Sequence, residues 1–406
     1  MMRLLSITLI FCSAFYSPVL FFSGKESMTG IEKEFYLESS FYGANYLHLK
    51  WNEWQDSAVY TLSCSAGSNM EYETIYNGSG TEFIHQGLKP NTVYYYRLSV
   101  KSKGKSVQLI PVAMRTLPEV IQFGGIPVKG FISNLTEKPM TKFPEYGKTL
   151  LITSSVAGNF SADSFFMVKG TNYSSGQQKI GFVLEDPGKS NITWGIMEQK
   201  GYFEKMIFLR YGPGNYTLKI MKKSDPADYW RYLSVQTVTN INPEDFRYLM
   251  PSESAQSFDP LIRAITLQLC GKETNPSNIA VLLHDYIIKT VFFDNEVYEG
   301  FSKPEDALSV LKRGSAVCAG YAHLYSAMLR VMNIPVKFIA GKTGDSVTVN
   351  HAWNEVWWGN GWHIIAVSWD DPLTNGHSDY PDGDNLRWKY FNILPSPILI
   401  PVNEKE

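Results

Sequence analysis

The stretch that decides the fold of the C-terminal part reads Gly314-Ser315-Ala316-Val317-Cys318-Ala319-Gly320-Tyr321-Ala322-His323-Leu324. A helical pattern runs from Cys318 to Met332, and the sequence Asn333-Ile334-Pro335 ends it. Cys318 therefore opens a predicted helix, where unpaired backbone N–H groups and the positive end of the dipole stabilise a thiolate. We expect this setting to lower the pKa of the thiol, and we predict Cys318 as a nucleophile.

A cysteine nucleophile works with an imidazole that moves the proton from the thiol to the leaving group. His351 is the candidate, because it begins a strand-like run that continues to Trp358. The turn Gly359-Asn360-Gly361 joins this run to a second predicted strand over 362–369. The hairpin is predicted to present His351 to the start of the cysteine helix.

Two further helices precede these motifs, one over about 260–270 and a second with Ser277 as its N-cap. Helices followed by β-rich sequence predict an α+β domain over 242–400.

The N-terminal part is predicted to be all β. Residues 46–51 alternate with period two, as a half-buried strand does. Leu88, Pro90, Thr92 and Tyr94 resemble the strand-entry pattern of fibronectin type III domains, which implies a β-sandwich over 32–117 that acts as a spacer or adhesion module. Residues 118–241 alternate strand-like runs with turns and predict a second β-sandwich.

The C-terminal motifs resemble the transglutaminase-like superfamily over about 240–395. The motifs that carry the resemblance are Val317-Cys318-Ala319-Gly320-Tyr321-Ala322, Asn333-Ile334-Pro335, His351-Ala352-Trp353-Asn354 and Trp369-Asp370-Asp371-Pro372. The resemblance implies a papain-like/transglutaminase-like fold and acyl transfer through a thioester, with no metal and no organic cofactor. The predicted fold class is thus multidomain, with two N-terminal all-β sandwiches followed by this α+β domain.

The third catalytic residue of that superfamily is an aspartate on the strand after the histidine. Counting from Trp362 and from the Asp-Asp-Pro sequence, this position is Ala366. Asp370 and Asp371, in the loop after the strand, are weak candidates for a substitute, and Asp370 is preferred over Asp371. Whether the chain is an enzyme is therefore left open.

The net charge of −2, without a run of basic residues, argues against nucleic acid as a partner. A charged start followed by an apolar run predicts that residues 1–27 are a signal peptide or a single membrane anchor, and both alternatives stay open. We expect an extracellular protein, secreted or anchored to the cell surface. Outside this leader lie Cys64, Cys270 and Cys318, an odd number that implies at least one free thiol.

Two hypotheses of different classes follow. In the first, the domain transfers or hydrolyses acyl groups at carboxamide or peptide carbonyls through a Cys318 thioester, with His351 as acid and base. Its substrates are extracellular proteins or peptides, cell-wall or matrix components among them. In the second, it is a catalytically impaired relative that binds peptides or glycans as a cell-surface adhesion module. Ala366 favours the second hypothesis, and the retained Cys318 and His351 favour the first.

Overall fold

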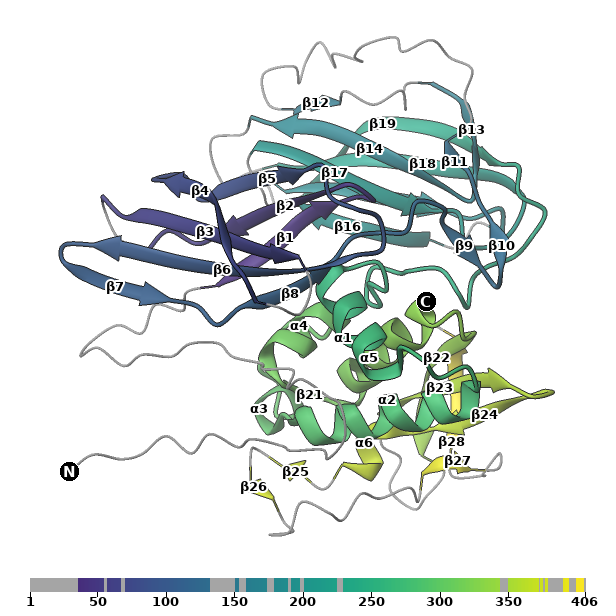
Figure 1. The fold of residues 1–406 in the computed structure, drawn as a ribbon. Coiled ribbons are helices and arrows are strands. Elements are labelled where there is room, and N and C mark those ends of the chain that lie inside the picture. Colours follow the sequence, from purple (N-terminus) through teal and green to yellow (C-terminus); the bar gives the residue numbers. More distant parts are fainter. Residues whose placement is uncertain are drawn as a thin grey trace. The chain divides into compact units, whose positions relative to one another are not determined.

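The structure is a computed structural model (Figure 1). It describes residues 36–54, 57–66, 70–131, 150–152, 158–173, 179–188, 191–197, 201–224, 229–343, 350–371, 373–374, 377–378, 390–393 and 399–404. Contacts within the chain divide it into two units. One unit comprises Met1–Glu38, Lys50–Phe83 and Tyr94–Ala113, and the other comprises Ser39–Leu49, Ile84–Val93 and Met114–Glu406.

The first strands of the chain form two antiparallel sheets. One has the order β1-β2-β5, from Leu37–Tyr42, Tyr46–Trp51 and Glu82–Gln86. The other has the order β4-β3-β6-β7, from Glu73–Gly78, Val59–Ala66, Val93–Ser102 and Lys105–Gln108, and β8 (Val112–Arg115) also pairs with β6. In β6 buried and half-buried residues alternate over most of its length, as expected of a strand with one covered face.

A second β region follows. A six-stranded sheet has the order β11-β13-β19-β18-β15-β16, from Gly130–Phe131, Phe160–Asp163, Tyr229–Asn240, Gly214–Ser224, Ile180–Glu185 and Asn191–Met197. A three-stranded sheet has the order β12-β14-β17, from Leu150–Ile152, Phe165–Asn172 and Gly201–Phe208. The short strands β9 (Gln122–Phe123) and β10 (Ile126–Pro127) pair with each other. Both larger sheets contribute side chains to one apolar core, for example Phe166 and Phe182, so this region is a β-sandwich.

Helices appear only after the last strand of the sandwich, within the described residues. They are α1 (Pro260–Cys270), α2 (Pro276–Thr290), α3 (Asn295–Tyr298), α4 (Ala307–Arg313), α5 (Cys318–Val331) and α6 (Val367–Asp370). The main sheet of this domain has the order β27-β24-β23-β22-β28, from Phe391–Ile393, Gly361–Ile365, Asn350–Trp358, Val336–Thr343 and Leu399–Glu404. A smaller sheet has the order β21-β20-β25-β26, from Ser315–Ala316, Phe292–Phe293, Leu373–Thr374 and His377–Ser378.

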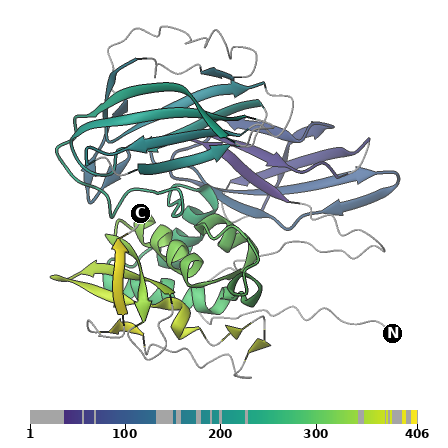
Figure 2. The ribbon, with the colours of Figure 1, turned by 180° about the vertical axis from the view of Figure 1, so that it is seen from behind.

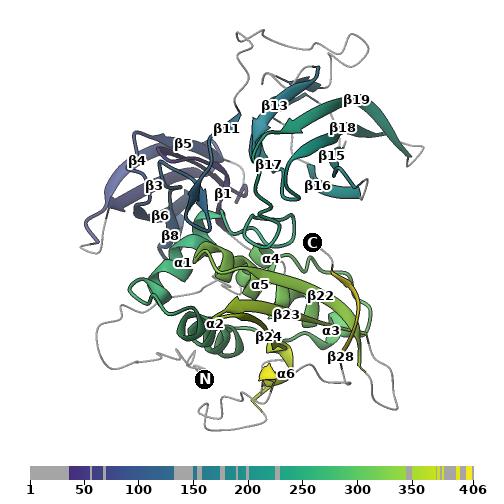
Figure 3. The same ribbon diagram turned by 90° about the vertical axis from the view of Figure 1, so that its right-hand side faces the viewer.

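The helix α5 is the centre of the C-terminal domain. It contacts α1, α2, α4 and α6 as well as β22 and β23. Figure 3 shows it against the strands β22 and β23, and Figure 2 shows the yellow strands of the same sheet from behind, beside the green helices. Because α5 is surrounded, ten of its residues are buried, among them Tyr325 and Ser326. The cysteine at its first position is thus held by a rigid, packed element.

The observed elements confirm the predicted fold class, a mostly β N-terminal region followed by a helix-containing domain. The predicted domain boundaries stay predictions. Two local predictions are wrong. The N-cap of α2 is Asn275 rather than Ser277, because its side chain accepts a hydrogen bond from the Ser277 N–H. The strand predicted over 362–369 ends at Ile365, and α6 follows it.

The predicted signal peptide or membrane anchor, residues 1–27, lies outside the described residues. Among the helices that the structure describes, none is long and apolar enough to span a membrane.

Candidate active site

Cys318 is the first residue of α5. The first intrahelical hydrogen bond runs from the Tyr321 N–H to the Val317 carbonyl, so the N–H groups of residues 318–320 have no acceptor inside the helix. Of the three described cysteines, Cys64 and Cys270 are buried and Cys318 is half-buried. Cys318, the cysteine that the sequence singled out, is thus the one described cysteine that is not fully buried as a residue.

The thiol of Cys318 lies beside the strand that carries His351. It packs in a small apolar cluster with Phe338 and Ala352. The backbone N–H of Ala352, the residue after His351, donates a hydrogen bond to the sulfur, and the N–H of Ala319 does so from the helix. The structure thus brings the start of α5 and the start of β23 together, as predicted.

The electrostatics of Cys318 differ from the prediction. Burial raises the pKa of the thiol above its ordinary value, and the hydrogen bonds from Ala352 and Ala319 only partly offset it. The negative charge of Glu305 acts in the same direction as burial. The lowered pKa expected from the helix start is wrong for this protein, because desolvation of the anion outweighs the helix N–H groups.

His351 is 7% exposed, and its ring stacks on Trp369 with the ring centroids 4.1 Å apart and the planes 9° from parallel. Burial lowers the pKa of the imidazole to about 4, so the ring is neutral at pH 7. The resting pair is therefore a thiol and a neutral imidazole.

The Nε2 atom of His351 is buried and has no hydrogen-bond partner among the described residues. The nearby Trp353 has the same property at its indole nitrogen. Ala366 is fully buried in the cluster that contains Trp353 and Trp369. An alanine methyl group cannot accept a hydrogen bond, which agrees with the reading of Ala366 as the altered third position.

Asp370, the candidate substitute for the third catalytic residue, makes its hydrogen bonds elsewhere. It is fully buried, and its carboxylate accepts the Tyr390 N–H, with N–O distances of 3.0 and 3.2 Å. Its other partner is Nε2 of His284 on α2, at 3.3 Å. Both carboxylate oxygens are thus occupied, and the hydrogen bonds of Asp370 do not include His351. Asp370 joins α2, α6 and the segment before β27, and its proposed role as a substitute is not supported.

His284 itself lies between two carboxylates, since its Nδ1 atom is 3.1 Å from Asp285 and its Nε2 atom faces Asp370. Burial lowers the pKa of this imidazole, but the hydrogen bonds to Asp285 and Asp370 outweigh burial and raise it. Sequence reasoning missed this group, because His284 stands in an ordinary helical pattern that carries no catalytic motif.

A second residue that sequence reasoning left without a role is Asn354. Its amide nitrogen lies 2.9 Å from the Ser326 hydroxyl and 3.2 Å from the carbonyls of Ala322 and Lys337. These contacts tie β23 to α5 a few residues beyond His351. Asn354 belongs to the quoted His-Ala-Trp-Asn motif, and that motif was the signal that marked it.

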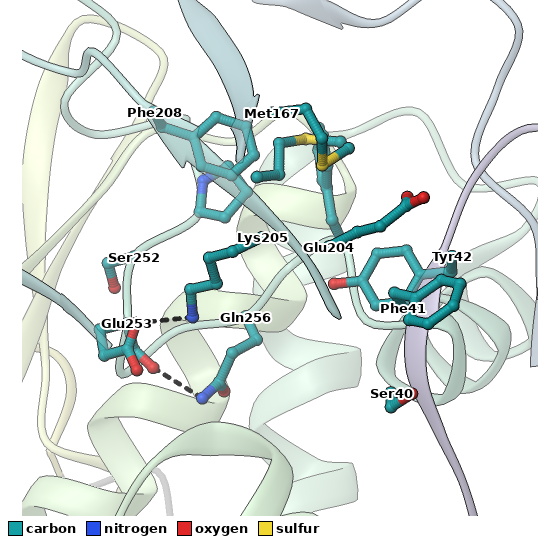
Figure 4. A pocket seen from close by; sticks show the side chains of 13 residues that line it. Ser40, Phe41, Tyr42, Met167, Glu204, Lys205, Phe208, Ser252, Glu253 and Gln256 are labelled. Carbon is teal, nitrogen blue, oxygen red and sulfur yellow. Dashed lines mark hydrogen bonds and ion pairs between the residues drawn. The ribbon is translucent and has the colours of Figure 1, made fainter. Parts of the chain in front are cut away.

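Figure 4 shows a pocket with a different set of lining residues. It has a volume of about 160 Å³ and is lined by parts of β1, β14, β17 and the segment before α1. Lys205 and Glu253 form an ion pair in it, at 3.0 Å. Cys318, His351 and Asp370 are absent from its lining. Among the described residues, no group of three His, Cys, Asp or Glu side chains is placed to hold a metal ion.

Comparison with known proteins gives a family match within the C-terminal part of the chain. Residues 263–366 match the family model of the transglutaminase-like superfamily. The matched segment contains Cys318 and His351 and ends at Ala366. Residues 263–366 are thus similar to the transglutaminase-like superfamily.

Among solved structures, a candidate cysteine protease from Cytophaga hutchinsonii is similar at 14% identity and a TM-score of 0.29, over 51% of this chain and 75% of that chain. A structure described as a TGase is similar at 18% identity and a TM-score of 0.23, over 30% of this chain and 33% of that chain. A human fibronectin type III domain is similar at 20% identity and a TM-score of 0.19, over 24% of this chain and 94% of that chain. No curated protein matches the chain.

Proposed function

We propose that the C-terminal domain transfers or hydrolyses acyl groups at carboxamide or peptide carbonyls through a thioester on Cys318. The observation that carries the proposal is the position of the thiol, at the start of α5 and in a hydrogen bond with the N–H of Ala352, next to His351. A nucleophile at a helix start beside an imidazole-bearing strand suits acyl transfer.

The reaction starts from the neutral pair. The sulfur of Cys318 attacks the carbonyl carbon while His351 takes the thiol proton as general base. Backbone N–H groups at the start of α5 stabilise the oxyanion, since those of residues 318–320 have no carbonyl acceptor inside the helix. The C–N bond then breaks, and the leaving ammonia or amine takes the proton from the imidazolium.

The thioester is resolved by a second nucleophile. Water gives a carboxylic acid, and a primary amine gives a new amide. In either case His351 takes the proton of the attacking group, and the proton then returns to the sulfur. We propose an extracellular protein or peptide as the substrate, cell-wall or matrix components included, and a location outside the cell. The charged start and apolar run of residues 1–27 support this location.

A second candidate function is a catalytically impaired domain that binds peptides or glycans at the cell surface. Two observations favour it, namely the buried Ala366 and the Nε2 atom of His351, which has no partner among the described residues. Without an acceptor at Nε2, the imidazolium that forms during the reaction receives no support. The raised pKa of Cys318 and the lowered pKa of His351 also make proton transfer from sulfur to nitrogen unfavourable.

One set of variants separates the two candidates. Incorporation of a labelled primary amine into glutamine peptides and hydrolysis of peptide amides are measured for the parent, Cys318→Ala and Ala366→Asp, with Cys64→Ala as the matched control. The proposal expects activity in the parent and in Cys64→Ala, and a loss of about 10³-fold or more in Cys318→Ala. Activity that survives Cys318→Ala contradicts the mechanism. Activity that appears only in Ala366→Asp supports the impaired domain.

A further inference from the structure

The carboxylate of Glu305 lies beside the start of α5, next to residues on either side of Cys318 in the sequence. Its Oε2 atom accepts the backbone N–H of Val317 at 2.9 Å. A Cβ atom placed on Gly320 would lie only 2.4 Å from the same oxygen. The carboxylate therefore fills the space beside the first helical turn, and the glycine at 320 is what leaves room for it.

Glu305 is held in this place by several contacts. Its Oε1 atom accepts a hydrogen bond from the Arg313 guanidinium at 2.5 Å, and Arg313 also donates to the Pro304 carbonyl at 2.7 Å. The Nδ1 atom of His323 lies 2.8 Å from the Glu305 carbonyl, and the His323 ring stacks on Phe338. The side chain of Glu305 is 17% exposed. A charge fixed beside the start of α5 acts on the neighbouring thiol, in the direction that raises its pKa.

Other ionisable groups face this region from each element around it. Arg313, at the end of α4, is a cation that partly offsets Glu305, and Asp294 lies 3.8 Å from the Arg313 guanidinium. Lys303 pairs with Asp294 at 2.8 Å. His351, on β23, is neutral at pH 7 because burial lowers its pKa to about 4. The negative charge of Glu305 raises the pKa of the Cys318 thiol.

We propose that Glu305 is a positioning residue for Cys318. The carboxylate of Glu305 accepts the N–H group at the start of α5 and holds the neighbouring thiol in its protonated form. The inference rests on the proposed function only in taking Cys318 as the nucleophile. The charge of Glu305 acts in the same direction as desolvation, which is the larger cause of the raised pKa of the thiol. A helix start stabilises an anion, and here the anion already present is a carboxylate.

The consequence is control of reactivity. The thiolate is the form that is alkylated and oxidised. A thiol held protonated therefore resists both reactions until a bound substrate shifts the equilibrium toward the thiolate. Such protection has an evident use for a cysteine outside the cell, which is the location proposed above.

The test is the pH profile of Cys318 alkylation by iodoacetamide in the full-length protein, followed at this residue by peptide mass spectrometry. Glu305→Gln keeps an oxygen for the Val317 N–H and removes the charge. We expect the apparent pKa of Cys318 to fall by about one unit, so that alkylation below the pKa becomes about tenfold faster. Glu296→Gln is the matched control, since it removes a carboxylate that is paired with Lys303 but exposed. It should leave the profile unchanged.

Arg313→Gln gives the opposite perturbation, because it removes the cation that offsets Glu305. We expect the apparent pKa of Cys318 to rise and alkylation to slow. An unchanged profile in Glu305→Gln overturns the inference. If Glu305→Gln does not fold, as judged by circular dichroism, an unchanged or lowered apparent pKa in Arg313→Gln overturns it instead.

Alkylation requires no substrate and no turnover, so the two proposals fail separately. A protein that shows these shifts without turning over any carboxamide keeps the role of Glu305 and loses the proposed function. A protein with Cys318-dependent turnover and an unchanged profile in Glu305→Gln keeps the proposed function and loses the role of Glu305.

Discussion

Replacement of Asp370 by asparagine distinguishes a structural from a catalytic role for this residue. The carboxylate is fully buried and accepts two kinds of hydrogen bond, one from the Tyr390 N–H at 3.0 Å and one involving His284 Nε2 at 3.3 Å. The variant Asp370→Asn retains an oxygen for the Tyr390 N–H. It removes the charge that faces His284, which is also fully buried.

The size of the effect follows from these contacts. Removing one member of a buried ion pair costs about 3–5 kcal/mol, because the other charge is left without compensation. His284 keeps Asp285 at 3.1 Å, so the lower end of that range applies. We expect the free energy of unfolding of the C-terminal domain to fall by about 3 kcal/mol, and its melting temperature by about 6–12 °C.

The loss of unfolding free energy in Asp370→Asn depends on pH. The pKa of His284 is raised in the folded protein, since the hydrogen bonds to Asp285 and Asp370 outweigh burial. A raised pKa stabilises the fold fully below the unfolded value of about 6.5, and this contribution disappears as the pH rises through the folded pKa. The difference between the parent and Asp370→Asn should therefore be largest at a pH of about 6 and smaller at high pH.

Thermal unfolding followed by near-ultraviolet circular dichroism at several pH values, together with iodoacetamide alkylation of Cys318, measures both properties. The structural role predicts a lower melting temperature with unchanged alkylation. Glu296→Gln serves as the control for loss of an exposed carboxylate, which costs less than about 1 kcal/mol. A variant Asp370→Asn with the stability of the parent but altered Cys318 reactivity would refute the structural role and restore Asp370 as a catalytic residue.

Three further predictions concern the surroundings of the site. Asn354→Ala leaves the buried carbonyls of Ala322 and Lys337 without their amide partner and should lower the free energy of unfolding by about 2–3 kcal/mol, measured by thermal unfolding. Burial lowers the pKa of His351 to about 4, so the free energy of unfolding is highest above a pH of about 6.5 and falls by about 3 kcal/mol in full as the pH drops toward 4. His351→Gln should remove this pH dependence of the free energy of unfolding between pH values of about 7 and 4.5. Trp369→Ala uncovers the stacked imidazole and should move the pKa of His351 up toward about 6.5 in an NMR titration; a pKa that stays near 4 would show that Trp369 is not the cause of burial.

The local pattern of the sequence was sufficient for the elements that carry the site. Cys318 opens α5 and His351 lies at the start of β23, because helical periodicity and the Gly359-Asn360-Gly361 turn are properties of short segments. The register of that hairpin places Trp358 opposite Gly361, as the turn requires.

The charge state of the site depends on groups that are distant in the sequence, and it was therefore not predictable from the motif. The pKa of Cys318 is raised by burial against β23 and by Glu305, which precedes α4 and belongs to none of the quoted motifs. Asp370 was a predicted partner of His351 because the loop after the strand could reach back to the imidazole. Its actual partner is His284 on α2, which only the packing of α2 against α6 reveals.

The most direct test of the central claim, that Cys318 and His351 act as nucleophile and base, is detection of the covalent intermediate. The protein is incubated with glutamine peptides and peptide amides, quenched in acid, digested and examined by mass spectrometry. We expect an acyl adduct on Cys318 in the parent that is absent in His351→Phe and more abundant in Ala366→Asp. An adduct on Cys318 that forms equally in His351→Phe, or no adduct in either the parent or Ala366→Asp, would contradict it.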